Sequence, residues 1–345
     1  MRIVHICPAD KFTPLFIEFI QRRFDNSEHQ FWIYGDLNLY GITAGVNILP
    51  LTGSMKNRLK LLWSLLKCNK VMLHSFHGIR LALLMLLNPW SLKKSYWYIW
   101  GGDLYQYQIS TRNLKWHVTE FLRKVVISRM AGIVTYIRGD YLNACERYSF
   151  RGRWFECLMY TSNVFSPVTD ENDKYKPGEP LIIMVGNSAT PTNNHSAAFD
   201  ILYACRNENI KIVCPLSYGI PDYAQTVEAA GRAMFGEHFS AITDYMPLQK
   251  YLELLNQVDI AIFSHTRQQA MGNTIALLGS GKTVFLNQNT TQWDFFRDKG
   301  IHVGDLQSFS LCLFSESQKE DNRKKISSYF SEENLARQLS ELFNA

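Results

Sequence analysis

The feature that most constrains the fold is an alternation of short apolar runs and helical stretches, which occurs twice along the chain. Apolar strands separated by helices are typical of a parallel sheet that is covered on both faces. The alternation stops at 166–180, where two breakers of the Pro-Gly type and a charge cluster interrupt it, and it restarts at 181. The sequence therefore predicts an α/β chain with two successive Rossmann-like, doubly wound domains.

The expected boundaries follow from this periodicity. In the first half we expect strands at 2–7, 30–34, 70–75, 95–100, 132–137 and 156–160, and helices near 12–25, 54–67, 78–87, 111–130 and 138–148. In the second half we expect strands at 181–185, 210–214, 239–242, 258–263 and 283–286, and helices near 194–207, 222–235, 247–256, 272–280 and 291–299. The predicted organisation is a domain at 1–165, a linker at 166–180, a second domain at 181–325 and a C-terminal helix at 326–345, with Ser331 as the candidate N-cap of the final helical stretch.

The charge of the chain is concentrated in its first half. Residues 1–165 carry 21 Lys and Arg against 10 Asp and Glu, whereas residues 166–345 carry 15 against 21. No acidic residue lies between Asp36 and Asp103, where eight basic residues occur. This is either a solvated basic face or a surface that meets anions. The amphipathic stretch at 55–67 makes an anionic membrane surface plausible. Nucleic acid is the rival partner, but the chain has no recognition motif for it.

We expect no membrane-inserted segment in the first half of the chain. The first ten residues have no basic region or small-residue cleavage site, so we expect a buried strand there instead of a signal peptide. The longest apolar stretch lies at 78–90 and is too short for a bilayer, which needs ~20 residues.

A small-residue loop follows the first strand of the second domain. Gly186 lets the backbone approach a ligand or another strand, and Asn187 and Ser188 supply hydrogen-bond donors. The loop is neither a G-x-G-x-x-G motif nor a P-loop, so it gives no support to an NAD or ATP site. An ordinary strand-to-helix turn and a cradle for an anion both remain open.

A second loop has stronger features of an anion site. Gly272, Asn273 and Thr274 open an apolar helix, and a helix N-terminus attracts anions through its free N–H groups and its dipole. Arg267 precedes that helix and can bind a phosphate with two N–H groups, although it can also be a surface residue.

The first domain offers candidate acid–base groups at predicted strand ends. Asp103 follows two glycines after an aromatic strand and can act as a base or as a helix cap. His74 and His77 end the preceding strand, and histidine is the usual proton acceptor near neutral pH. Arg138 and Asp140 follow another strand and can form a structural pair. Because no D-x-D motif occurs, we expect no metal site. The negative charge of a leaving group would then be stabilised by cationic side chains and a helix N-terminus.

Several motifs, taken in order, resemble one known family. They are "YIWGGDLYQY", "IRGD", "VGNS" followed by Asn-His, "VCPLSYG" and "RQQAMGNTIALLGSGKTVFLNQNTTQW". Together they resemble glycosyltransferase family 56, the 4-alpha-L-fucosyltransferases, whose members transfer TDP-4-acetamido-4,6-dideoxygalactose to lipid II in enterobacterial common antigen synthesis. The resemblance runs roughly from Lys70 to Ile301.

The resemblance implies a GT-B fold with two Rossmann-like domains and an inter-domain cleft. It also implies a peripheral protein on the cytoplasmic face of the bacterial inner membrane, a dTDP-activated amino-dideoxy sugar (Fuc4NAc-like) as donor, and a polyprenyl-diphosphate-linked saccharide as acceptor, with no cofactor. On this reading the first domain meets the membrane and the acceptor, and the second binds the donor. Asp103 and His77 are the catalytic candidates. The donor-binding candidates are Gly186, Asn187, Ser188, Tyr218, Arg267, Gln268, Gln269, Gly272, Asn273 and Thr274, and the other cleft candidates are Arg138, Asn194 and His195.

The chain departs from the family pattern at two places near the expected sugar site. Gly101-Gly102-Asp103 stands where the family has Gly-Ala-Asp, and Ala270 stands where it has glycine. An O-antigen or capsule transferase that uses a related dTDP-sugar is therefore an alternative to the common-antigen enzyme. A nucleotide-sugar 2-epimerase of the same two-domain design and a non-catalytic nucleotide-binding scaffold are the rivals outside this class.

Overall fold

The computed structural model describes residues 2–51, 55–166 and 178–345, which form two compact units. Unit 1 consists of Met1–Val164 together with Glu332–Ala345, and unit 2 is Phe165–Ser331. Most of the predicted linker lies outside the described residues. Within the described ranges, no helix combines the length and the apolar character that a membrane span requires.

Unit 1 is built on a seven-stranded parallel sheet with the strand order β3-β2-β1-β4-β5-β6-β7. Its strands are β1 (Ile3–Pro8), β2 (His29–Tyr34), β3 (Ile48–Pro50), β4 (Lys70–His74), β5 (Ser95–Tyr98), β6 (Gly132–Val134) and β7 (Arg153–Phe155). The chain moves outward in one direction from β1 and then in the other from β4. The loops after β1 and β4 therefore diverge, which creates a topological switch point at their carboxyl ends.

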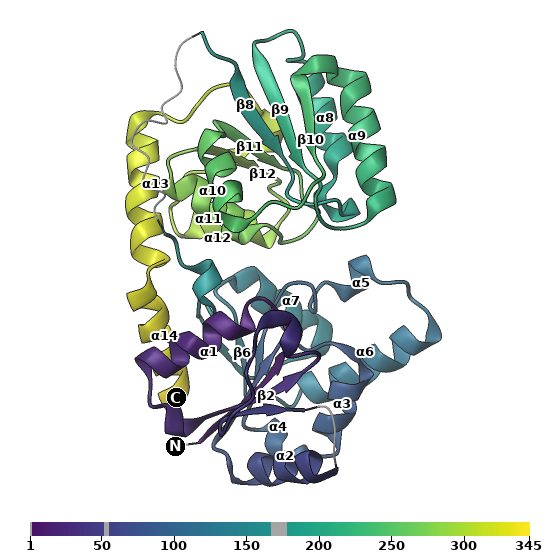
Figure 1. Ribbon diagram of the computed structural model, residues 1–345, viewed down its shortest axis with the longest axis vertical. Coiled ribbons are helices and arrows are strands. Elements are labelled where there is room, and N and C mark those ends of the chain that lie inside the picture. The colour runs from purple at the N-terminus through teal and green to yellow at the C-terminus, as the bar shows by residue number, and fades with distance from the viewer. Residues whose placement is uncertain (1, 52–54, 167–177) are drawn as a thin grey trace. The chain divides into compact units, whose positions relative to one another are not determined.

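Helices cover both faces of this sheet (Figure 1). They are α1 (Thr13–Arg23), α2 (Met55–Lys67), α3 (Gly78–Leu86), α4 (Pro89–Leu92), α5 (Gln106–Ile109), α6 (Leu114–Ile127), α7 (Arg138–Tyr148) and α14 (Glu332–Asn344). Side chains alternate along β1, as strand geometry requires. Val4 and Ile6 pack into a core that includes α2, α3 and α6. His5 faces the other way, toward Phe16 of α1 and Phe343 of α14.

Unit 2 repeats the plan with a six-stranded parallel sheet in the order β10-β9-β8-β11-β12-β13. Its strands are β8 (Leu181–Val185), β9 (Ile210–Pro215), β10 (Phe239–Ile242), β11 (Ile260–Phe263), β12 (Thr283–Leu286) and β13 (Gly304–Asp305). Its helices are α8 (His195–Tyr203), α9 (Pro221–Phe235), α10 (Leu248–Gln257), α11 (Met271–Gly279), α12 (Thr291–Asp298) and α13 (Glu316–Tyr329). The switch point lies between β8 and β11. The predicted α/β class with two doubly wound parallel sheets is confirmed.

The strand that the sequence predicts at 156–160 is wrong. The seventh strand of unit 1 is β7, which ends at Phe155, and the following residues form an irregular buried segment. Met159 has a φ of 69°, a left-handed conformation that interrupts an extended strand. The short edge strands β3 and β13 were not predicted, because a two- or three-residue strand is too short to show periodicity. Helix α13 was not predicted as a separate helix.

The tail differs from the single helix expected at 326–345. The chain forms two helices there, α13 in unit 2 and α14 in unit 1. The apolar face of α14 buries Leu335, Leu339 and Leu342 in unit 1. Lys70 donates from Nζ to the carbonyl oxygen of Leu342 at 2.7 Å, which ties the helix end to β4. The last helix therefore completes the first unit of the chain.

Candidate active site

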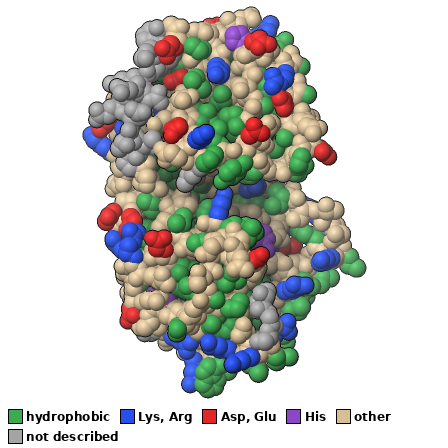
Figure 2. Space-filling view, viewed as in Figure 1, with side chains coloured by type: hydrophobic (Ala, Val, Ile, Leu, Met, Phe, Trp, Pro, Cys, Tyr) green, Lys and Arg blue, Asp and Glu red, His purple; other side chains and the backbone are tan. Residues whose placement is uncertain are grey.

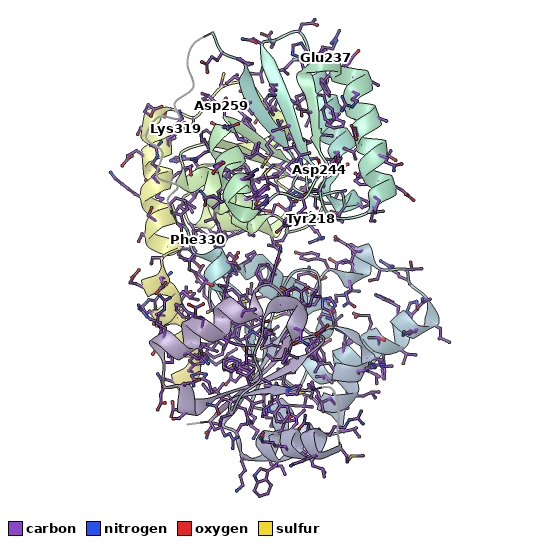
Figure 3. All side chains as sticks on the ribbon, viewed as in Figure 1. Tyr218, Glu237, Asp244, Asp259, Lys319 and Phe330 are labelled. Atoms are coloured by element: carbon purple, nitrogen blue, oxygen red, sulfur yellow. The ribbon has the colours of Figure 1, made fainter. Side chains whose placement is uncertain are left out.

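The carboxyl ends of β8 and β11 bring two predicted donor loops together at the switch point of unit 2. Figure 3 locates this edge of the sheet, with Tyr218 and Asp244 at one end of unit 2 and Glu237 and Asp259 at the opposite end. Tyr218 and Asp244 follow β9 and β10, whereas Glu237 and Asp259 precede β10 and β11. In open α/β sheets, ligands bind at the carboxyl ends of the strands beside the switch point.

Gly186 occupies a position at this edge that only glycine fits without strain. Its φ is 66°, and a Cβ there would lie 2.7 Å from His195 Nε2 and 2.9 Å from Asn193 Oδ1. Both distances are shorter than a normal carbon contact. The glycine therefore lets the loop turn tightly against the start of α8, whereas the sequence suggested an approach to a ligand or another strand.

Asn187 and Gln269 join the two loops through a network of amide and hydroxyl groups. Gln269 Nε2 donates to Asn187 Oδ1 at 3.1 Å, and Asn187 Nδ2 donates to the Tyr218 hydroxyl at 2.8 Å. Thr192 donates from its hydroxyl to Gln269 Oε1 at 2.7 Å. Asn187 and Ser188 are buried, whereas the Tyr218 side chain is 58% exposed. The network forms a prearranged polar floor, and Tyr218 presents its ring to solvent.

Asn193 is the centre of this floor and was not among the predicted site residues. Its Oδ1 accepts from the backbone N–H of Asn187 at 2.9 Å and from His265 Nε2 at 3.1 Å. Its Nδ2 donates to Ser188 Oγ at 3.0 Å. Burial, followed by the charge of Arg267, lowers the pKa of His265 to about 3. The position of Asn193 just before α8 is its only sequence signal.

Helix α11 begins at this edge without a side-chain cap. Its N-cap residue, Ala270, has the left-handed values φ 57° and ψ 29°, and no side chain bonds the first turn. Gly272 is exposed, and Asn273 donates to the Tyr251 hydroxyl at 2.6 Å. Thr274 is fully buried, and its hydroxyl accepts from Gln292 at 2.8 Å, so its side chain supports the helix from within.

Arg267 and Gln268 lie directly ahead of α11. Arg267 is half-buried and donates from Nη1 to the carbonyl oxygen of Gln268 at 2.9 Å. A guanidinium beside a helix N-terminus places two kinds of positive potential at one point. The second loop therefore stays a candidate anion site.

Asn194 and His195 start α8 on the floor of the site. Asn194 has a φ of 51°, and its Nδ2 is 3.4 Å from Ser264 Oγ. His195 is buried, and its Nδ1 is 3.2 Å from the Tyr223 hydroxyl. Among the described residues, its Nε2 has no hydrogen-bond partner. Burial lowers the pKa of His195 to about 4, so the ring is neutral near pH 7.

In unit 1, Asp103 is a buried clamp between two loops. Its Oδ2 accepts from the backbone N–H of Phe76 at 2.8 Å and from Trp97 Nε1 at 2.6 Å, and its Oδ1 accepts from the N–H of Trp100 at 2.9 Å. The side chain is fully buried. Three N–H donors on a carboxylate fix the loops that follow β4 and β5. This geometry suits positioning better than proton transfer.

His77 lies next to this clamp and is exposed. Its Nδ1 contacts Gln106 Nε2, and partial desolvation lowers the pKa of the ring. The preceding Ser75 has a φ of 66° and a buried hydroxyl that has no partner among the described residues. Strained backbone of this kind gathers at functional sites. The sequence pointed to His74 and His77 on either side of this serine, and Ser75 itself was not predicted.

Three further charged residues belong to this part of unit 1. Arg138 is exposed at the first position of α7, where the helix dipole favours an anion beside it. Asp140 accepts from the Tyr105 hydroxyl at 2.8 Å. Arg123, which no sequence signal suggested, is fully buried and donates from Nη2 to the carbonyl oxygen of Asp103 at 2.7 Å. This hydrogen bond from Arg123 holds the backbone of Asp103 in place.

A row of buried rings crosses the other face of the unit 1 sheet. His5 Nε2 is 2.9 Å from His29 Nδ1, and His5 Nδ1 is 3.0 Å from His74 Nε2. His74 Nδ1 is 2.5 Å from the Tyr160 hydroxyl, which accepts from Trp100 Nε1 at 2.8 Å. Burial lowers the pKa of His5 well below its usual value, that of His29 to about 4 and that of His74 to about 3. We call these residues the histidine row.

The two parallel-sheet units define a class of fold, GT-B. Three solved structures share the fold over essentially their whole length. They are HepE of Anabaena in complex with UDP and glucose (9% identity, 100% of both chains, TM-score 0.68), a glycosyltransferase from Rickettsia africae (14%, 99% of this chain and 97% of that chain, 0.63) and sucrose-phosphate synthase from Thermosynechococcus elongatus (9%, 100% and 98%, 0.63).

The particular family follows from the sequence match. The chain belongs to the 4-alpha-L-fucosyltransferase family, glycosyl transferase group 56, whose family model matches residues 65–328. The match covers β4 to β7 of unit 1 and nearly all of unit 2. The family that the motifs suggested is confirmed, and the protein is a glycosyltransferase.

Proposed function

We propose that the protein transfers an amino-dideoxy sugar related to Fuc4NAc from dTDP to a polyprenyl-diphosphate-linked saccharide. The reaction would take place on the cytoplasmic face of a bacterial inner membrane, in the synthesis of common antigen or O-antigen. The observation that supports the proposal most directly is the uncapped start of α11 beside Arg267, at the switch point of unit 2. This is where a nucleoside diphosphate finds N–H donors and a guanidinium together.

The bond between the sugar C1 and the β-phosphate oxygen breaks, and a bond between C1 and the acceptor oxygen forms. The departing dTDP gains negative charge, which Arg267 and the first N–H groups of α11 stabilise. The exposed ring of Tyr218 stacks on the thymine, and Gly186, Asn187, Ser188 and Gln269 form the floor beneath the sugar. Among the described residues, no group of three His, Cys, Asp or Glu side chains is placed to hold a metal ion. We therefore expect turnover to persist in EDTA.

His77 takes the acceptor proton in this proposal, and Asp103 acts as a positioning residue. The Asp103 carboxylate holds the N–H of Phe76, the residue before His77. A His77→Gln enzyme should lose kcat by about 100-fold, the usual contribution of a general base. Its affinity for dTDP should stay unchanged. Retention of full kcat would remove His77 from this role.

A thermal-shift screen with dTDP, UDP, GDP and CMP at matched concentration tests the donor class, because a ligand that binds the native state raises its apparent stability. We expect a shift with dTDP and a loss of that shift in Arg267→Ala. The matched control is Arg232→Ala, an exposed arginine of α9 that pairs with Glu228. A shift with UDP alone would contradict the donor assignment. A dTDP shift without transfer or hydrolysis of a dTDP-sugar would favour a scaffold.

A further inference from the structure

Helix α2 has an apolar face that its own unit does not cover. Leu61, Ser64 and Leu65 form its buried side and face the core of unit 1. A second set of large apolar side chains points to solvent. These are Met55 (68% exposed), Leu59 (60%), Trp63 (56%) and Leu66 (53%). At about 100° per residue, all four fall within a sector of about 80° on the helix. We call them the apolar stripe.

Basic side chains border the apolar stripe on both sides. Lys56, Lys60 and Lys67 follow its edge on one side, and Arg58 lies on the other, by the same helical geometry. All four are exposed. Lys67 Nζ lies 4.1 Å from the centre of the Trp63 ring, so cation and indole share one surface. The order of faces around α2 is therefore core, cation, apolar stripe and cation.

The neighbouring surface continues this composition. The short helix α4 packs against α2 and exposes Trp90, and Leu87 at the end of α3 is also exposed. No acidic residue occurs between Asp36 and Asp103. Figure 2 shows basic and hydrophobic side chains gathered over the end of unit 1 that carries α2 in Figure 1.

We propose that α2 docks unit 1 onto an anionic lipid bilayer, with the apolar stripe among the acyl chains and the flanking cations at the headgroups. A helix that lies in a membrane interface needs an apolar face and a basic border. Helix α2 has both, and the exposed Trp90 of α4 adds to the apolar contact area. This inference rests on the proposed function and specifies which surface of unit 1 binds the membrane.

A second copy of the chain fits the same face less well. A two-fold contact through the apolar stripe would bring the Lys and Arg borders of both copies together, and like charges at an interface are unfavourable. An anionic bilayer supplies a countercharge for every one of these side chains. Charge complementarity therefore selects the bilayer.

Vesicle sedimentation tests the docking surface without any nucleotide sugar. The purified full chain is mixed with vesicles of phosphatidylcholine alone or with about one third phosphatidylglycerol. We expect binding only to the anionic vesicles. The Leu59→Ser/Trp63→Ser variant should bind at least about tenfold more weakly, and so should Lys56→Gln/Lys60→Gln/Lys67→Gln. The matched controls are Leu142→Ser, an exposed leucine of α7, and Lys324→Gln, an exposed lysine of α13. Both should bind like the wild type.

Three results would overturn the proposal. The first is no binding to either vesicle, and the second is wild-type binding by both α2 variants. The third is a concentration-dependent dimer that the α2 variants abolish while vesicle binding is absent, which would assign the stripe to self-association. Tryptophan quenching by brominated lipid should fall in Trp63→Leu, and the quenching that remains is expected from Trp90 of α4. Sugar transfer to a short-chain, water-soluble acceptor would be unaffected by any of these results, so failure here is distinct from failure of the proposed reaction.

Discussion

The histidine row makes unit 1 sensitive to mild acid. Each neutral imidazole donates one hydrogen bond and accepts one, which is what a row of His29, His5 and His74 ending on Tyr160 requires. A protonated ring would carry two N–H donors and would oppose the N–H of a neighbour. Burial and this bonding therefore keep the folded rings neutral at pH values where the unfolded chain is protonated.

The direction and size of the change in the free energy of unfolding with pH follow from proton linkage. The folded pKa values are lowered, to about 4 for His29 and about 3 for His74, and well below the usual value for His5. An unfolded histidine titrates near 6.5, so the unfolded chain binds more protons below that pH. The stabilisation is complete above about pH 6.5 and is lost as the pH falls toward the folded values. From pH 7 to 5 the unfolding free energy falls by about 2 kcal/mol for each of His29 and His74, or about 4 kcal/mol together, against a typical total of ~5–15 kcal/mol. The lowered pKa of His5 acts in the same direction.

Urea unfolding followed by tryptophan fluorescence measures this loss in unit 1, because seven of the eight tryptophans belong to that unit. We expect the free energy of unfolding to fall by about 4 kcal/mol or more between pH 7 and 5. His29→Gln should reduce this fall by about 2 kcal/mol. The exposed His117→Gln is the matched control and should keep the wild-type dependence. Equal stability at pH 7 and 5, or an unchanged pH dependence in His29→Gln, would refute the reasoning.

Three further predictions concern backbone and loop positions. Ala270→Gly should raise the free energy of unfolding of unit 2 by ~0.5–1 kcal/mol, because alanine is strained at φ 57°; a decrease in urea unfolding would show that the residue is not strained. Gly186→Ala should lower it by about 2 kcal/mol or more, since the new Cβ would lie 2.7 Å from His195 Nε2, and thermal unfolding of unit 2 checks this. Asp103→Asn should cost unit 1 about 2–3 kcal/mol, because an amide nitrogen would face an N–H donor where the carboxylate accepts three. Tryptophan fluorescence follows the last change, and wild-type stability would mean that the carboxylate is not a clamp.

Much of the architecture could be predicted from periodicity. The strands β8, β10 and β12 and the helix α7 have the predicted bounds, because each is a continuous apolar or amphipathic segment between clear breakers. The same rule failed at 156–160, where composition resembles a strand but the left-handed Met159 prevents one. Local composition carries no information about such a backbone reversal.

The candidate donor site was predicted in outline. Arg267 and the start of α11 could be predicted, because a polar loop followed by a glycine and an apolar stretch is a local pattern that indicates a helix N-terminus. Asn193 was not predicted, since its contacts with Asn187 and His265 join the loops that follow two separate strands. For Asp103 the sequence left a base and a helix cap open, and the structure shows a buried carboxylate that accepts from Trp97 and Trp100 nearby in the chain and from Phe76 on another loop.

The sequence by itself determined the α/β alternation, the two domains, the family and the basic first half, since each of these depends on local pattern or on order along the chain. The tertiary structure alone decided which polar groups are buried, which helix faces remain open and where the last helix packs. His5, His29 and His74 are far apart in sequence and adjacent only because β2, β1 and β4 are neighbours in the sheet. Burial and hydrogen bonding depend on such long-range neighbours, and these set the charge state and the role of each side chain.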